Sequence, residues 1–102
     1  MKYEDFEDNV VQWATARKIY EHSTVQAQYI KAVSEMGELG DSIIKGENAL
    51  DDLGDTIVCL LNVAHMLGLD MQDAFDTAWD DIKDRKGHMV PGGAFVKDRT
   101  DG

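Results

Sequence analysis

This sequence has a single cysteine and no long apolar run. Cys59 is the only cysteine among 102 residues. It lies in an apolar stretch and has no partner within the chain, which excludes a disulfide framework, favours a reducing cytoplasm and makes Cys59 a core residue. No run of about 18 apolar residues occurs, and the first residues mix polar with apolar side chains. We therefore expect neither a membrane span nor a signal peptide.

Basic residues are also scarce. The chain has 10 Lys and Arg against 20 Asp and Glu, which gives a formal net charge of −10. Such a charge repels DNA, RNA and anionic membranes, so we expect neither nucleic acid nor membrane as a partner. A phosphorylated small molecule fits only if metal cations or a local basic cluster reverse the electric field at its site.

Apolar residues recur at three- and four-residue spacing and predict an all-α chain. The first such pattern begins at Tyr3 and ends near Ile19, as in an amphipathic helix. Ser23 and Gln26 are typical of a capping box at the start of the next helix. Glycines at 46, 68 and 87 then mark helix ends. The four predicted helices cover residues 3–19, 24–45, 49–67 and 71–86.

Residues 87–102 form a tail that is too short for a domain. Pro91, Gly92 and Gly93 predict an ordered loop or short strand there, followed by a frayed end. Short connections favour antiparallel packing, so residues 1–102 are expected to form one four-helix bundle-like domain. A domain of this size buries a limited share of its surface, and helix 49–67 is apolar on nearly every side. We therefore expect a homodimer or homotetramer.

Acidic pairs on the second and third helices are the main candidates for chemistry. Glu35 and Glu38 lie on a polar stripe, which solvent exposure alone would explain. Asp52 and Asp55 lie on a face that continues through apolar residues, where an unpaired carboxylate is costly. If the two helices are antiparallel, the pairs face each other and form an oxygen-ligand site suited to Mg²⁺ or Mn²⁺. The alternative, left open here, is that Lys31 and a neighbouring cation neutralise these acids.

These acids also carry a family resemblance. The stretch SEMGEL, from Ser34, and the stretch DLGD, from Asp52, resemble the EExxE and ExxD motifs of MazG-type nucleoside triphosphate pyrophosphohydrolases. Two positions depart from the motifs, because Ser34 stands in place of the first glutamate and Asp52 in place of the glutamate of the second motif. Asp52 is one methylene shorter than glutamate and would reach a metal ion less readily.

The resemblance implies a fold, a metal site and a reaction. The fold would be all-α, and the metal ligands would be Glu35, Glu38, Asp52 and Asp55. The reaction would be hydrolysis of a (deoxy)nucleoside triphosphate to monophosphate and pyrophosphate, with water attacking the α-phosphorus. Mg²⁺ is the expected metal, with Mn²⁺ as a substitute. Glu38 and Glu35 are the expected catalytic residues, with Glu38 as the acceptor of a proton from water.

Several other residues are candidates for binding the substrate. Lys31 can bind phosphate or form an ion pair with Glu35 one turn away. Trp13 can stack on a base, although a tryptophan is more often a core residue, and Asn62 can read a base because its amide needs partners on an apolar helix. The remaining candidates are Gln28, and at the end of the fourth helix Lys83, Arg85 and Lys86, for which capping of that helix is the alternative.

Two other functions compete with this one. The first is a related pyrophosphohydrolase that acts on phosphoribosyl-ATP or on deoxyuridine nucleotides, which substrate profiling would separate. The second is a non-catalytic acidic helical protein that oligomerises, which predicts no metal-dependent turnover.

Overall fold

The computed structural model describes residues 1–98 of the chain. Its helices are α1 (Tyr3–Ala16), α2 (Ile19–His22), α3 (Val25–Lys45), α4 (Leu50–Met66) and α5 (Met71–Ile82), and its strands are β1 (Gly87–Met89) and β2 (Phe95–Lys97). The predicted all-α class is confirmed, since the strands are only three residues each. Among the described helices, none is by itself long and apolar enough to cross a membrane, although α4 and α5 together reach that length and composition.

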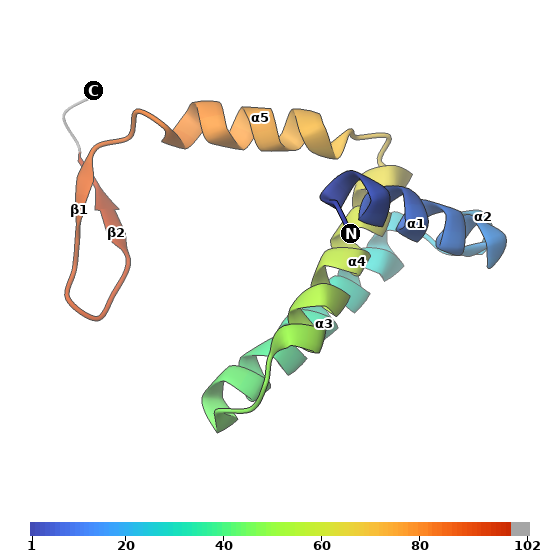
Figure 1. Ribbon diagram of the computed structural model, residues 1–102, viewed down its shortest axis with the longest axis horizontal. Coiled ribbons are helices and arrows are strands. Elements are labelled where there is room, and N and C mark those ends of the chain that lie inside the picture. The colour runs from blue at the N-terminus through green and yellow to red at the C-terminus, as the bar shows by residue number, and fades with distance from the viewer. Residues whose placement is uncertain (99–102) are drawn as a thin grey trace. The chain divides into compact units, whose positions relative to one another are not determined.

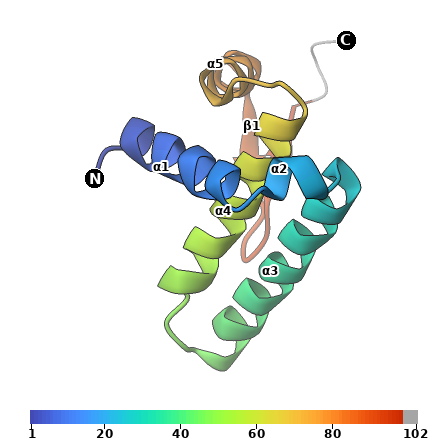
Figure 2. The same cartoon turned by 90° about the vertical axis from the view of Figure 1, so that its right-hand side faces the viewer.

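The chain divides into two compact units, Met1–Met71 and the residues from Gln72 onward. In the first unit α3 and α4 are antiparallel neighbours along their length, and α1 packs across α4 (Figures 1 and 2). Cys59 is buried in this unit and has a free thiol, as predicted. Besides Cys59, the buried apolar residues of the core are Val10, Ala14, Ala32, Leu61 and Ala64. That residues 1–102 form a single domain stays a prediction.

The first predicted helix, 3–19, is two helices in the structure. α1 ends at Ala16, and Lys18 takes the left-handed conformation with φ 60° and ψ 30°. Its backbone N–H bonds to the carbonyl of Thr15 at 3.0 Å, and the chain then begins the short helix α2. A left-handed lysine carries no sequence signal comparable to glycine. The structure therefore has five helices among its described residues, one more than predicted.

The hairpin of α3 and α4 begins and ends close to the predicted residues. The Thr24 hydroxyl accepts a hydrogen bond from the Ala27 N–H at 3.1 Å, so Thr24, and not Ser23, caps α3. Gly46 ends α3 with φ 69°, a backbone conformation that favours glycine. The Asn48 side chain accepts from the Leu50 N–H at 2.9 Å and opens α4.

The second unit consists of α5 and a β-hairpin. α5 ends at Ile82 rather than at the predicted residue 86, because the chain turns with the Arg85 N–H bonded to the Ile82 carbonyl at 2.9 Å. β1 and β2 pair antiparallel, with His88 opposite Val96. The short strand predicted in the tail is therefore one arm of a hairpin. The predicted frayed end, 99–102, lies outside the described residues.

Candidate functional site

Facing turns of α3 and α4 bring the four predicted acidic ligands together. Glu35 and Glu38 lie on α3, and Asp52 and Asp55 lie on α4. The pKa of Glu38 is raised above its ordinary value, first by a hydrogen bond with Glu35 and by the charge of Glu35, and further by the charges of Asp52 and Asp55. The four groups are thus close enough to repel one another, and a cation bound among them would relieve that repulsion.

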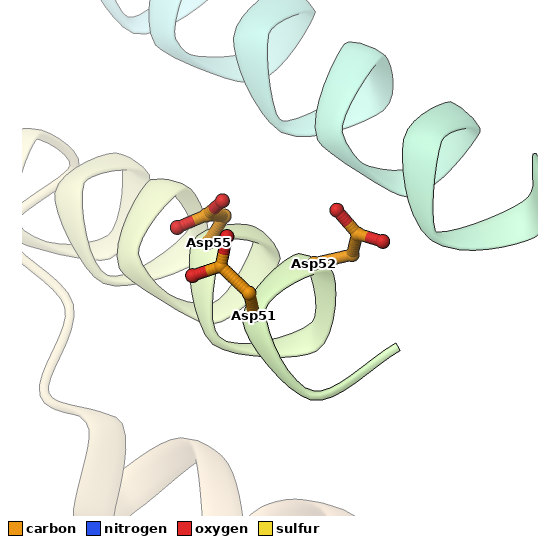
Figure 3. Close-up of side chains that lie close together, drawn as sticks. All are labelled: Asp51, Asp52 and Asp55. Carbon is orange, nitrogen blue, oxygen red and sulfur yellow. The ribbon is translucent and has the colours of Figure 1, made fainter. Parts of the chain in front are cut away.

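A fifth carboxylate, Asp51, joins this cluster. Carboxylate oxygens of Asp51, Asp52 and Asp55 lie within 4.8 Å of one another, and Figure 3 shows Asp51 beside Asp55 while Asp52 points toward α3. Loss of solvent raises the pKa of Asp55, and the charge of Asp51 raises it further. Asp51 was not among the residues predicted from the sequence, although its i, i+4 spacing to Asp55 places both on one face of α4.

Asp52 is held from the opposite helix. The Ser42 hydroxyl of α3 donates a short hydrogen bond to Asp52 Oδ2, and the Thr56 hydroxyl donates to the Asp52 backbone carbonyl at 2.9 Å. The bond from Ser42 fixes one oxygen of the shorter acid and orients its carboxylate. Ser42 follows Glu38 by four residues and lies on the same face of α3, but this spacing does not show which side chain of α4 it contacts.

Glu35 has one oxygen near a cation and one oxygen without a partner. Lys31 Nζ lies 3.7 Å from Glu35 Oε1, and the Lys31 side chain is 61% exposed. The i, i+4 ion pair considered from the sequence therefore exists. Glu35 Oε2 is buried, and among the described residues it has no hydrogen-bond partner. A buried carboxylate oxygen without a partner is unfavourable, and a metal ion would satisfy it.

The donor set fits a hard divalent cation. It consists of carboxylate oxygens from two helices. His65, the single histidine of α4, is exposed and lies in the last turn of that helix, at the opposite end from Asp52 and Asp55. Oxygen-only donors are what Mg²⁺ and Mn²⁺ prefer. One partly exposed lysine cannot neutralise five carboxylates. The residues present therefore suit a metal site better than a set of protein ion pairs.

A pocket of about 450 Å³ lies between α1 and α4, beside this cluster. Asp55 belongs to both the pocket lining and the carboxylate cluster. Trp13 lines the pocket and is 46% exposed, so it is not a core residue, and the Arg17 guanidinium lies 4.5 Å from the centre of its ring system. The remaining lining residues are Met1, Phe6, Asn9, Val10 and Val58.

Two predicted binding residues have hydrogen-bond partners within the first unit. The Asn62 side chain is buried and accepts a hydrogen bond from the Tyr20 hydroxyl at 2.7 Å. The Tyr20 ring stacks near His65, with centroids 4.2 Å apart, so this group fastens α2 to α4. Gln28 donates to the Ser23 hydroxyl at 3.0 Å. Their roles in substrate binding stay predictions.

The three basic candidates near the end of α5 lie in the second unit. Lys83 pairs with Asp80 at 3.0 Å, and Arg85 pairs with Asp81 at 2.8 Å. The Lys86 carbonyl accepts from the Asp98 N–H at 2.8 Å beside the hairpin. These ion pairs are exposed, so they contribute little to stability. Phosphate binding by these side chains also stays a prediction.

Comparison with known proteins identifies the fold. No protein-family model matches the sequence, and no curated protein matches it significantly. Among solved structures, the chain is similar to the cyanophage S-2L MazG-like pyrophosphohydrolase bound to dGDP and three catalytic Mn²⁺ ions per active site. The TM-score is 0.70 at 16% sequence identity, and the match covers 95% of this chain and 97% of that one. The chain therefore has the all-α MazG-like fold.

Proposed function

We propose that this protein hydrolyses a (deoxy)nucleoside triphosphate to the monophosphate and pyrophosphate with the help of Mg²⁺ or Mn²⁺. One observation carries the proposal. Two antiparallel helices hold Glu35, Glu38, Asp52 and Asp55 in one cluster, with an unpartnered buried oxygen on Glu35. The likeness to a MazG-like pyrophosphohydrolase with a bound nucleotide and Mn²⁺ supports the same reaction.

The four predicted acids would hold the metal. Asp55 and Glu35 lie in half-buried positions, and the oxygen of Asp52 that does not bond to Ser42 is left to coordinate. A bound divalent cation would neutralise phosphate charge and lower the pKa of bound water. Asp51 extends the donor set and allows more than one ion. Because the protein is strongly acidic, metal is what makes a polyphosphate acceptable at this site.

Glu38 is proposed as the base that takes a proton from the attacking water. A carboxylate oxygen of Glu38 that does not bind the metal would accept this proton. Glu38 is exposed, so water has access to it. Glu35 lies one turn before Glu38 on α3 and would orient it. Lys31, next to Glu35, would bind a phosphate oxygen.

The substrate would extend from the carboxylate cluster in two directions. The pocket next to Asp55 offers the Trp13 ring for stacking on the base. On the phosphate side, Lys31 is the proposed cationic ligand from the first unit. Gln28 and Asn62 would support the binding site from within the first unit, Asn62 by fixing α2 through Tyr20.

The proposed location of the enzyme is the cytoplasm. A free buried cysteine, Cys59, is compatible with that reducing compartment.

We also propose that a second copy of this chain covers the apolar faces of α3 and α4. The apolar side of an amphipathic helix needs a packing partner, yet in the single chain Ile44 of α3 is 85% exposed and Ile30 is 66% exposed. A run of large exposed apolar residues on two adjacent helices is typical of a protein interface. The other exposed large hydrophobic residues on these two helices are Tyr29, Val33, Met36, Ile43, Leu50, Leu53, Ile57 and Leu60.

A nucleotide panel tests the proposed reaction. Each ribo- and deoxyribonucleoside triphosphate is incubated with the protein and Mg²⁺ or Mn²⁺, and the products are separated by ion-exchange chromatography. At least one substrate should yield monophosphate and pyrophosphate, and a chelator should stop turnover. Release of diphosphate and orthophosphate would contradict the proposal, as would turnover that a chelator does not affect.

A further inference from the structure

We infer that the pocket between α1 and α4 holds the nucleobase of the substrate and that Asn9 determines which base it accepts. This inference rests on the proposed function and assigns a role to Asn9, a residue outside the carboxylate cluster. The pocket lies wholly within the first unit of the chain, so its walls are placed relative to the metal-binding acids.

Asp55 sets the orientation of the substrate. Its carboxylate lies in the acidic cluster, and its side chain also forms part of the pocket wall. A nucleotide with its phosphates at the cluster would therefore have its sugar and base beside this pocket. The volume of about 450 Å³ falls within the range of roughly 300–1,000 Å³ that is typical of small-molecule sites.

The walls suit a flat aromatic group and not a phosphate. The apolar lining comes from Met1, Phe6, Val10, Trp13 and Val58. Trp13 presents a half-exposed ring system, on which any base can stack because every base has a π-face. Asp55 is the one acidic lining residue, and without a metal ion its charge would repel an anion. The base end of the nucleotide is the part that this chemistry accepts.

Asn9 is the one side chain in the lining that offers both a neutral donor and a neutral oxygen acceptor. It lies four residues before Trp13 on α1, so the two side chains project from one face of the helix. Its amide nitrogen is 3.9 Å from the Met1 sulfur, and a thioether is a weak acceptor. The amide therefore keeps most of its hydrogen-bonding capacity for a ligand.

The amide places one donor and one acceptor side by side. Such a pair complements a base edge that offers one acceptor and one donor. A carboxylate in the same place would offer two acceptors. Among the common bases, guanine presents two adjacent donors on its pairing edge, N1–H and the 2-amino group. Asn9→Asp should therefore shift preference toward guanine, and Asn9→Ala should reduce discrimination between bases.

Nucleoside binding tests the pocket without metal or catalysis. The chain has two tryptophans, and Trp79→Phe leaves Trp13 as the only one. Adenosine, guanosine, cytidine and uridine, with their deoxy forms, are titrated into this variant while the Trp13 fluorescence is recorded. At least one nucleoside should quench the fluorescence saturably. Asn9→Ala should lower the affinity for the preferred nucleoside by about tenfold. Asn9→Asp should raise the affinity for guanosine relative to the other nucleosides.

Gln12→Ala is the matched control. Gln12 is an exposed amide on the same helix and is not part of the pocket lining, so its loss should leave the order of affinity unchanged. Asn9 is exposed as well, so the thermal midpoint of each variant should stay at that of the parent. Absence of saturable quenching by every nucleoside would overturn the inference. So would an unaltered order of affinity in both Asn9 variants.

Hydrolysis assays with the same variants separate this inference from the proposed function. Metal-dependent hydrolysis with a base preference that both Asn9 variants leave unchanged would refute the role of Asn9 and leave the function standing. Nucleoside binding that depends on Asn9, without hydrolysis of any triphosphate, would refute the proposed function and support the pocket assignment. A changed ratio of kcat/KM between bases in Asn9→Asp supports both.

Discussion

The Ser42 hydroxyl donates a hydrogen bond to Asp52 Oδ2 and thereby joins α3 to α4 at the carboxylate cluster. Ser42 is proposed as a positioning residue for Asp52. Removing a group that orients a metal ligand costs about 10- to 100-fold in metal affinity or activity. Ser42→Ala should lower the Mn²⁺ affinity measured by titration calorimetry to that extent, and Ser42→Thr, which keeps the hydroxyl, should restore most of it. Equal affinities for the alanine variant and the parent would show that the bond does not position Asp52.

The acidic ligands themselves should be more sensitive than Ser42. Glu35→Gln, Glu38→Gln and Asp55→Asn keep the size of each side chain but remove the charge that binds a hard cation. Each should lower kcat/KM by more than the roughly 100-fold upper range expected for a group that only orients a ligand. Glu47→Gln, at an exposed position between α3 and α4, is the control and should keep full activity. Full activity in Asp55→Asn would mean that the metal site is misplaced.

Crowding of these carboxylates should make the metal-free protein sensitive to pH. The pKa of Glu38 and the pKa of Asp55 are both raised in the folded protein. Folding therefore favours the protonated forms, and this contribution to stability is complete below the unfolded-state pKa values and is lost as the pH rises through the raised folded-state values. Glu38→Gln removes one of these charges.

Urea unfolding in a chelator measures this effect. Glu38→Gln should have a higher urea midpoint than the parent at neutral pH, and the difference should shrink as the pH is lowered toward about 4, the ordinary range of glutamate. A variant that is less stable than the parent at neutral pH would show that Glu38 is paired with a cation and not repelled by its neighbours.

Coverage of the apolar helix faces should make the chain an oligomer. Multi-angle light scattering should give a mass of at least twice the 11.4 kDa of one chain. Ile44→Asp, at an apolar position that is 85% exposed in the single chain, should shift the mass toward the monomer, because burying a carboxylate in an apolar interface is unfavourable. A fully active species with the mass of one chain would rule out a role for the second copy.

The helices were predictable where local chemistry fixes their ends. Gly46 ends α3 with a positive φ, as its sequence signal predicted. The start of α3 was predicted to within one residue, although its cap is Thr24 and not Ser23. The break at Lys18 was not visible, because a left-handed lysine depends on how α2 returns to pack on α4 through Tyr20 and Asn62. The early end of α5 at Ile82 was likewise not visible, since no glycine or proline marks it.

The candidate site, like the helices, was predictable from the sequence only in part. Glu35, Glu38, Asp52 and Asp55 could be selected because helical periodicity places each pair on one face, and the resemblance to a known motif supports the choice. Ser42 and Asn9 could not be selected. Their importance depends on which side chain of another helix lies opposite, and hydrophobic periodicity does not determine that register. Asn9 becomes a candidate only once α1 is seen to cross α4 next to Asp55.

The position of bond cleavage tests the central claim most directly. The preferred triphosphate is hydrolysed in ¹⁸O-labelled water with Mg²⁺, and both products are analysed by mass spectrometry. Attack of water on the α-phosphorus predicts one ¹⁸O atom in the nucleoside monophosphate and none in the pyrophosphate. Label in the pyrophosphate, with an unlabelled monophosphate, would mean attack on the β-phosphorus and would contradict the proposed reaction.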